Sequence, residues 1–239
     1  MTKKSLLLVI LLTIFSFSYS QEITVGVKGG INFNSIGDLL SYGGSYQTGA
    51  PDIVYSPDQE MGTQYGMFLD VSFGRIFLRP EVIFSSIKSS YALPLNVANW
   101  TATRMDIPVL LGFHIAGPVS IVAGPVFSSV SDLELEGLEP DKPSVIYDES
   151  LLNFQAGILL EMGRFGVDVR YEYGLKKVEF QDDLDFFYQT PPAYGINRGA
   201  LLEYNASQII VSVHINIARF NSNERKSMSR SDWRNHKRL

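Results

Sequence analysis

Eight segments of this sequence alternate apolar and polar residues with a period of two, the spacing of a β-strand whose two faces meet different surroundings. In one of them Phe165, Val167 and Val169 alternate with glycine and charged residues. Each segment is about 9 to 12 residues long, which suits a strand that crosses a membrane at a tilt. The eight segments are 23–33, 64–73, 76–85, 104–114, 119–128, 152–161, 165–173 and 208–217.

The connections between these segments alternate between short and long. The short ones are Gly74-Arg75, Gly163-Arg164 and the turn Ala116-Gly117-Pro118. Glycine in the first position of a two-residue loop suits a hairpin, because glycine adopts positive φ readily. Short turns at one end and long loops at the other are typical of an up-and-down barrel in an outer membrane. The long connections are 34–62, 88–99, 129–150 and 176–205.

We therefore predict an all-β fold: an eight-stranded antiparallel up-and-down transmembrane β-barrel with a polar, side-chain-filled interior. Glycines beside long charged residues on the polar face favour a narrow lumen. An apolar band about 25 Å high matches the hydrocarbon layer of a membrane. The tight turns also set the register, and they place Asp70 opposite Arg79. The alternative is a soluble lipocalin-like ligand-binding barrel, in which the apolar face would point inward.

The two ends of the chain differ from the barrel segments. Lys3 and Lys4, an apolar run over 6–17 and small residues before position 21 have the pattern of a secretory signal peptide. We predict cleavage after Ser20, a barrel over 21–218, a basic periplasmic tail over 219–239 and localisation in the outer membrane. The sequence contains no cysteine, which excludes disulfides, thiolate metal sites and a lipid-modified cysteine in it.

Charged residues on the polar face are predicted to form a paired network inside the barrel. An eight-stranded barrel has room only for side chains, and charges in so confined a space must be paired. We therefore predict a barrel that does not conduct. Acids outnumber bases, so one or more carboxyls is expected to be protonated, to bind a cation or to reach water. The predicted network is Lys28, Asp70, Arg79, Glu81, Arg104, Asp106, Glu161, Asp168, Arg170 and Glu172.

No residue pattern points to an enzyme, a cofactor or a metal. The acidic segment 132–141 lacks the glycine and the ligand spacing of an EF-hand, so we expect a solvated loop. His114 and His214 fall on the polar face near the periplasmic end. A histidine near Ser and Asp can form a hydrolytic triad, but a lipid hydrolase needs its site on the lipid side. We expect both histidines to be held by interior hydrogen bonds instead.

Three stretches resemble the PorT-like family of outer-membrane β-barrels. They are "GVKGGINFNSI" (26–36), "RMDIPVLLGF…GPVSIVAGPVF" (104–127) and "FQAGILLEMGRFGVDVRYEYGL" (154–175). The resemblance implies an outer-membrane barrel of about eight strands, and it implies that some relatives assist protein secretion. This chain departs from the usual barrel ending, because a tail continues past Phe220.

Most acidic residues fall in the long connections, whereas the tail carries basic residues such as Arg225, Lys226 and Arg230. Outer-membrane lipid is the first expected partner. Envelope or secretion proteins are the candidate protein partners, through the loops or the basic tail. For the tail we expect a solvated, disordered end, and the alternative is a contact with anionic lipid or an acidic periplasmic partner. No nucleic-acid partner is expected outside the cytoplasm. The predicted function is a structural or accessory role in the envelope, including support of protein secretion. The alternatives are a small-solute porin and the lipocalin-like binder.

Overall fold

The structure is a computed structural model that describes residues 21–42, 52–92, 97–136, 150–186 and 197–221. The predicted signal peptide and residues 222–239 of the predicted tail lie outside these ranges. The described residues contain no helix that is long and apolar enough to span a bilayer.

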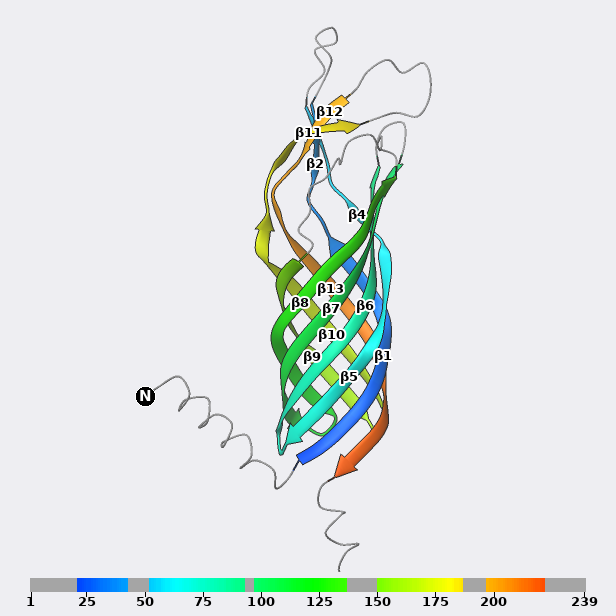
Figure 1. Cartoon of the computed structure of the whole chain (residues 1–239), viewed down its shortest axis with the longest axis vertical. Helices are drawn as coiled ribbons and strands as arrows, with labels where there is room; N and C mark the ends of the chain where they lie inside the picture. Colours follow the sequence, from blue (N-terminus) through cyan, green and yellow to red (C-terminus); the bar gives the residue numbers. More distant parts are fainter. Residues whose placement is uncertain (1–20, 43–51, 93–96, 137–149, 187–196, 222–239) are drawn as a thin grey trace, which may run out of the picture.

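Eight antiparallel strands close into a barrel, as predicted (Figure 1). They follow one another around the ring in chain order, and the last strand closes the barrel by pairing with the first. Each of the eight alternating segments forms one of these strands. They are β1 (Gln21–Ser35), β5 (Met61–Phe73), β6 (Ile76–Ala92), β7 (Val97–Ala116), β8 (Val119–Glu136), β9 (Ser150–Met162), β10 (Phe165–Val178) and β13 (Tyr204–Asn221).

Tight turns join the strands at one end of the barrel. Phe73 pairs with Ile76, and Met162 pairs with Phe165, so both hairpins have two-residue loops. Gly74, Gly117 and Gly163 have φ of 67°, 53° and 68°, a backbone region that other residues rarely adopt. β1 begins and β13 ends at this same end (Figure 1).

The turns set the predicted register. Val71 pairs with Leu78, and Val169 pairs with Ile158 on the same face of the sheet. Asp70 lies on the inner face, where it contacts Arg79. The side-chain period of two therefore holds across both hairpins, and a slip of one residue would exchange lipid-facing and lumen-facing residues.

The strands extend well beyond the predicted segments, so that parts of the predicted long connections 34–62, 88–99, 129–150 and 176–205 are themselves strands. β7 contains 20 residues, and β6 reaches Ala92. A second, four-stranded sheet forms above the barrel in the order β11-β12-β2-β3, and a short strand β4 pairs with β6. These strands are β2 (Leu39–Ser41), β3 (Ile53–Tyr55), β4 (Asp58–Gln59), β11 (Gln181–Phe186) and β12 (Asn197–Leu201).

This external region has its own small core. Leu39, Tyr91, Trp100, Ala200 and Leu201 are all buried there. The hydroxyl of Tyr91 donates a hydrogen bond of 2.6 Å to the carbonyl oxygen of Gly37. Burial raises the pKa of Tyr91 above its usual value, and burial also raises the pKa of Tyr204 to about 12. Both hydroxyls therefore stay protonated at neutral pH.

The outer face of the barrel is apolar. Val169, Val213 and Leu111 are 49%, 60% and 60% exposed. Exposed aromatic residues gather at two levels, as in the aromatic girdles of membrane barrels. Eight residues of one strand separate the levels, or about 20 Å at a tilt of about 40°. The lower level has Phe73, Phe113, Phe165 and Phe220, and the upper has Tyr65, Phe84, Phe127, Phe154 and Tyr173.

The lipocalin-like alternative requires the opposite orientation of the two faces. In this barrel the charged side chains point inward and the large apolar side chains point outward. An outward apolar belt between two aromatic levels suits a lipid bilayer and would be unfavourable in water. The fold is therefore a transmembrane β-barrel.

One part of the lumen differs from the prediction of a polar interior. Phe77, Leu110, Val122 and Leu159 form a buried apolar cluster between β6 and β9. The inward face of Gly112 lies against the Phe77 ring, so that a Cβ there would collide with the ring. Small and large residues thus alternate inside, as a narrow barrel requires.

Candidate functional site: a buried ion-pair network

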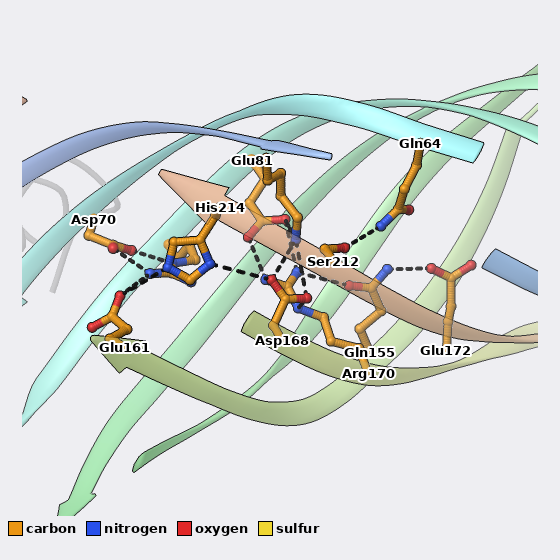
Figure 2. A network of polar contacts seen from close by, with 12 residues as sticks. Gln64, Asp70, Glu81, Gln155, Glu161, Asp168, Arg170, Glu172, Ser212 and His214 are labelled. Atoms are coloured by element: carbon orange, nitrogen blue, oxygen red, sulfur yellow. Dashed lines mark hydrogen bonds and ion pairs between the residues drawn. The ribbon is translucent and has the colours of Figure 1, made fainter. Parts of the chain in front are cut away.

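The structure places all ten charged residues of the predicted network in the lumen. Nine of them are buried, and the side chain of Glu161 is 23% exposed at the end with the tight turns. They come from β1, β5, β6, β7, β9 and β10, so that the contacts cross the barrel in several directions (Figure 2). Three layers of contacts follow one another along the axis.

The first layer lies near the tight turns and is centred on Arg79. Its Nε is 2.5 Å from Asp70 Oδ1, and its Nη2 is 2.5 Å from Asp70 Oδ2. Nη2 also donates to Glu161 Oε1 at 3.0 Å. The guanidinium lies 4.6 Å from the ring centroid of Phe68 and 5.4 Å from that of Phe77. The cation is thus held by two carboxylates and two aromatic faces.

The middle layer joins opposite walls of the barrel. Arg170 of β10 binds Glu81 of β6 through Nη1–Oε2 at 2.8 Å and Nη2–Oε1 at 2.7 Å. Lys28 Nζ lies 3.3 Å from Glu81 Oε2 and 3.2 Å from Asp168 Oδ2. Arg170 Nε is 3.0 Å from Asp168 Oδ1, but this pair is too poorly aligned for a hydrogen bond. It acts as a purely electrostatic contact.

His214 links the first two layers. It is 1% exposed, with Nε2 3.4 Å from Glu161 Oε1 and Nδ1 3.8 Å from Asp168 Oδ2. The ring edge also faces Phe68, at 5.2 Å between centroids. Neither ring nitrogen has a well-aligned hydrogen bond among the described residues, so the expectation of satisfied hydrogen bonding was wrong for His214. When the ring is protonated, His214 forms ion pairs with the carboxylates of Glu161 and Asp168.

His114 differs from His214. Its Nδ1 lies 2.7 Å from Ser120 Oγ, and its ring packs on Phe77 at 4.8 Å between centroids. This contact agrees with the expectation of interior hydrogen bonding at His114.

The third layer lies toward the external end. Arg104 Nε is 2.8 Å from Asp106 Oδ1, and Nη1 is 3.0 Å from Glu172 Oε1. Asn153 and Gln155 donate to Glu172 at 2.9 and 2.5 Å. The amides fill the acceptor sites that Arg104 leaves open on this carboxylate, which a buried charge needs. The layer connects to the middle one because Arg170 Nη1 reaches Gln155 Oε1 at 3.5 Å.

Among the described residues, the void that the network encloses in the middle of the lumen is small. A void of about 10 Å³ lies there, between Lys28, Glu81, Asp106 and Arg170 among others. This volume is at the lower limit for holding a single water molecule. On the side of the tight turns a polar cavity of about 220 Å³ contains Arg79 and Glu161 in its walls. The described residues thus form a plug between two open ends.

A larger cavity of about 390 Å³, which we call the external chamber, lies on the other side of the plug. Arg104, Glu172 and Gln208 are among its polar lining residues. Its apolar lining includes Ile87, Trp100, Ala102, Val130, Leu151 and Tyr204.

Charge balance in the lumen involves one residue that the sequence analysis did not assign to the network. Six carboxylates face four Lys and Arg side chains, and His214 stands between two of the carboxylates. A protonated His214 would offset part of the excess negative charge. Among the described residues no group of three or more His, Asp and Glu side chains has a geometry that could hold a metal ion.

No protein-family model matches the sequence, and no curated protein matches it. Membership of the PorT-like family therefore stays a prediction. Among solved structures, the chain is similar to the outer membrane protein OprG from Pseudomonas aeruginosa, with 13% identity, a TM-score of 0.47 and coverage of 85% of this chain and 97% of that one. It is also similar to Neisserial surface protein A, with 11% identity, a TM-score of 0.43 and coverage of 82% of this chain and 99% of that one. A third similar structure is Ail of Yersinia pestis, with 12% identity, a TM-score of 0.37 and coverage of 84% of this chain and 99% of that one. Likenesses this distant carry no inference about function.

Proposed function

We propose that this protein is a closed integral barrel of the outer membrane that serves the envelope as a structural or accessory component and does not conduct solutes. The void of about 10 Å³ in the middle of the lumen is the observation that carries this proposal. Solutes cannot pass a lumen whose middle has room for about one water molecule at most. The small-solute porin is the competing function, and it would require this plug to move.

Planar bilayers and liposome swelling test the closed state. The purified protein should give no steady conductance and should admit no small sugars. A double variant, Glu81→Ala with Arg170→Ala, removes the pair that joins opposite walls and is the matched positive control, because it should conduct. A stable open channel in the unmodified protein that also passes sugars would move the protein to the porin class.

The accessory role rests on the region outside the bilayer. The second sheet and the extended strands β6, β7 and β8 form a folded platform at the end opposite the tight turns (Figure 1). Such a rigid surface suits recognition of another envelope protein. The resemblance to PorT-like barrels makes a secretion protein the first partner to seek.

Affinity purification from detergent-solubilised membranes, after cross-linking, tests that role. A secretion or other envelope protein should travel with the barrel, and substitution of the exposed Ile53 and Val54 on β3 by serine should weaken its recovery. Recovery of the barrel alone, with cross-linking shown to work on a known complex, would contradict the role.

N-terminal sequencing of the mature protein tests cleavage after Ser20. Carbonate washing tests membrane integration, which a soluble barrel would fail.

A further inference from the structure

The external chamber has features of a ligand site that the closed-barrel function does not use. Its volume of about 390 Å³ falls within the range of small-molecule sites, which are largely apolar with a few fixed polar groups. Trp100 and Ala102 in its wall are 6% and 4% exposed. The third layer of the ion-pair network forms its floor, so the chamber is blind toward the periplasm.

Two buried polar atoms of the floor, one on Arg104 and one on Gln208, lack hydrogen-bond partners among the described residues. Arg104 is 4% exposed and Gln208 is 3% exposed. Arg104 Nη2, a hydrogen-bond donor, and Gln208 Oε1, an acceptor, make no hydrogen bond there. Leaving a buried polar group unpaired is unfavourable by about 1–3 kcal/mol. A group that both accepts and donates matches this donor and this acceptor.

Lys176, Lys177 and Glu179 also line the chamber, and the charges around Arg104 define which head group fits at its floor. Asp106 and Glu172 already lie 2.8 and 3.0 Å from its nitrogens. An anionic head group would bring a third negative charge to one guanidinium. An ammonium would direct its own donors at the Nη2 donor. An uncharged hydroxyl can accept from Arg104 and donate to Gln208, and it carries no charge into a buried site.

The strand register shows where a ligand can enter. Pairing of β9 with β10 ends at Asn153–Gly174, although β10 continues to Val178. The chamber is lined at this divergence by Leu151 from β9 and by Val178 from β10. Phe154 and Tyr173, in the upper aromatic level, pair directly below it. This divergence of the two strands therefore lies at the outer membrane–water interface, where amphiphiles concentrate.

We propose that the external chamber binds an uncharged single-chain amphiphile from the membrane interface, with its apolar chain against Trp100 and Ala102 and its hydroxyl between Arg104 and Gln208. This site does not depend on whether the barrel has a protein partner. Because the plug closes the floor, the ligand is held and released on the external side and does not cross the membrane.

The fluorescence of Trp100 reports binding directly. The sequence contains two tryptophans, and Trp233→Phe leaves Trp100 as the single emitter. In phosphatidylcholine nanodiscs, which avoid competing detergent, 1-decanol should shift this emission with saturation. Decanoate and decylamine should bind at least tenfold more weakly. A tighter response to decylamine or decanoate would overturn the assignment of an uncharged head group.

Variants separate the chain site from the head-group site. Ala102→Phe fills the chamber and should abolish the saturable shift, whereas Ala156→Phe, the same change on the lipid face, should leave it intact. Gln208→Leu should weaken decanol about tenfold, the loss expected for one hydrogen bond, and leave the response to decane unchanged. Folding of each variant is checked by the altered gel mobility of the unheated barrel. Equal effects of Ala102→Phe and Ala156→Phe would show that decanol only partitions into the lipid, and this result would refute the site. A Gln208→Leu variant that binds decanol as tightly as the parent protein would refute it as well.

Discussion

Arg170 and Glu81 bind each other across the lumen through two parallel contacts, Nη1–Oε2 at 2.8 Å and Nη2–Oε1 at 2.7 Å, although 89 positions separate them in the chain. Both side chains are at most 1% exposed. Glu81→Gln should therefore lower the free energy of unfolding by about 3–5 kcal/mol, because it leaves Arg170 and Lys28 with one carboxylate fewer in a buried site. Urea unfolding from lipid vesicles measures this change.

An exposed ion pair provides the control for that measurement. Lys177 Nζ lies 2.6 Å from Glu203 Oε1, but the two side chains are 51% and 59% exposed. Lys177→Met should change the free energy of unfolding by less than about 1 kcal/mol. A loss at Glu81→Gln as small as that at Lys177→Met would mean that water reaches the middle of the lumen, and the closed-barrel proposal would fail with it.

The orientation of the two faces gives a second prediction. Val169 on β10 and Val54 on β3 are 49% and 52% exposed, but the first faces the lipid belt and the second faces water. Val169→Arg should lower the free energy of unfolding by about 2–4 kcal/mol, because it places a charge near the midplane of the bilayer. Val54→Arg should be close to neutral. Similar losses at both positions, measured in the same vesicles, would contradict a membrane-spanning belt.

The barrel could be predicted from the sequence because a strand that faces lipid on one side and a polar lumen on the other has alternating apolar and polar residues. Short turns such as Gly74-Arg75 then fixed which residues oppose one another, and hence the contact between Asp70 and Arg79. Inward charges were recognisable for the same reason, since any polar residue between lipid-facing neighbours must point into the lumen.

Other features left no such pattern. Short strands such as β2 and β3 have too few residues to display a period, so the second sheet was mistaken for loops. Leu110 and Leu159 are apolar residues in inward positions, and they became visible as a core only once the strands were placed around them. The placement of His214 between Glu161 and Asp168 depends on three different strands, and no local spacing predicts it. The alternation of apolar and polar residues in 208–217 did predict that His214 lies on the inner face, and this was the only part of its placement that the sequence indicated.

Close packing in the lumen gives a third prediction. A Cβ at Gly112 would collide with the Phe77 ring, whereas a Cβ at Gly29 would meet only the carbonyl oxygen of Gln64, at 3.8 Å. Gly112→Ala should lower the free energy of unfolding by about 1–3 kcal/mol through overpacking. Gly29→Ala should be tolerated. Adding Phe77→Leu to Gly112→Ala should restore part of the loss, and an unaltered loss in the double variant would show that the ring is not the cause.

The external region gives the last prediction. Tyr91 is fully buried, and its hydroxyl donates to the carbonyl oxygen of Gly37 at 2.6 Å. Tyr91→Phe removes the donor and leaves a buried carbonyl unpaired, so the local stability should fall by about 1–3 kcal/mol. The membrane-spanning barrel lies outside this contact and should keep its own stability. Limited proteolysis should therefore cut the external region of the variant faster, while the unheated barrel fragment stays intact on a gel.

Tyr173→Phe, which changes an exposed tyrosine of the upper aromatic level, should leave the rate of cutting at its parental value. If both variants were cut at the same rate, the external region would owe its order to its apolar core rather than to the hydrogen bond between Tyr91 and Gly37.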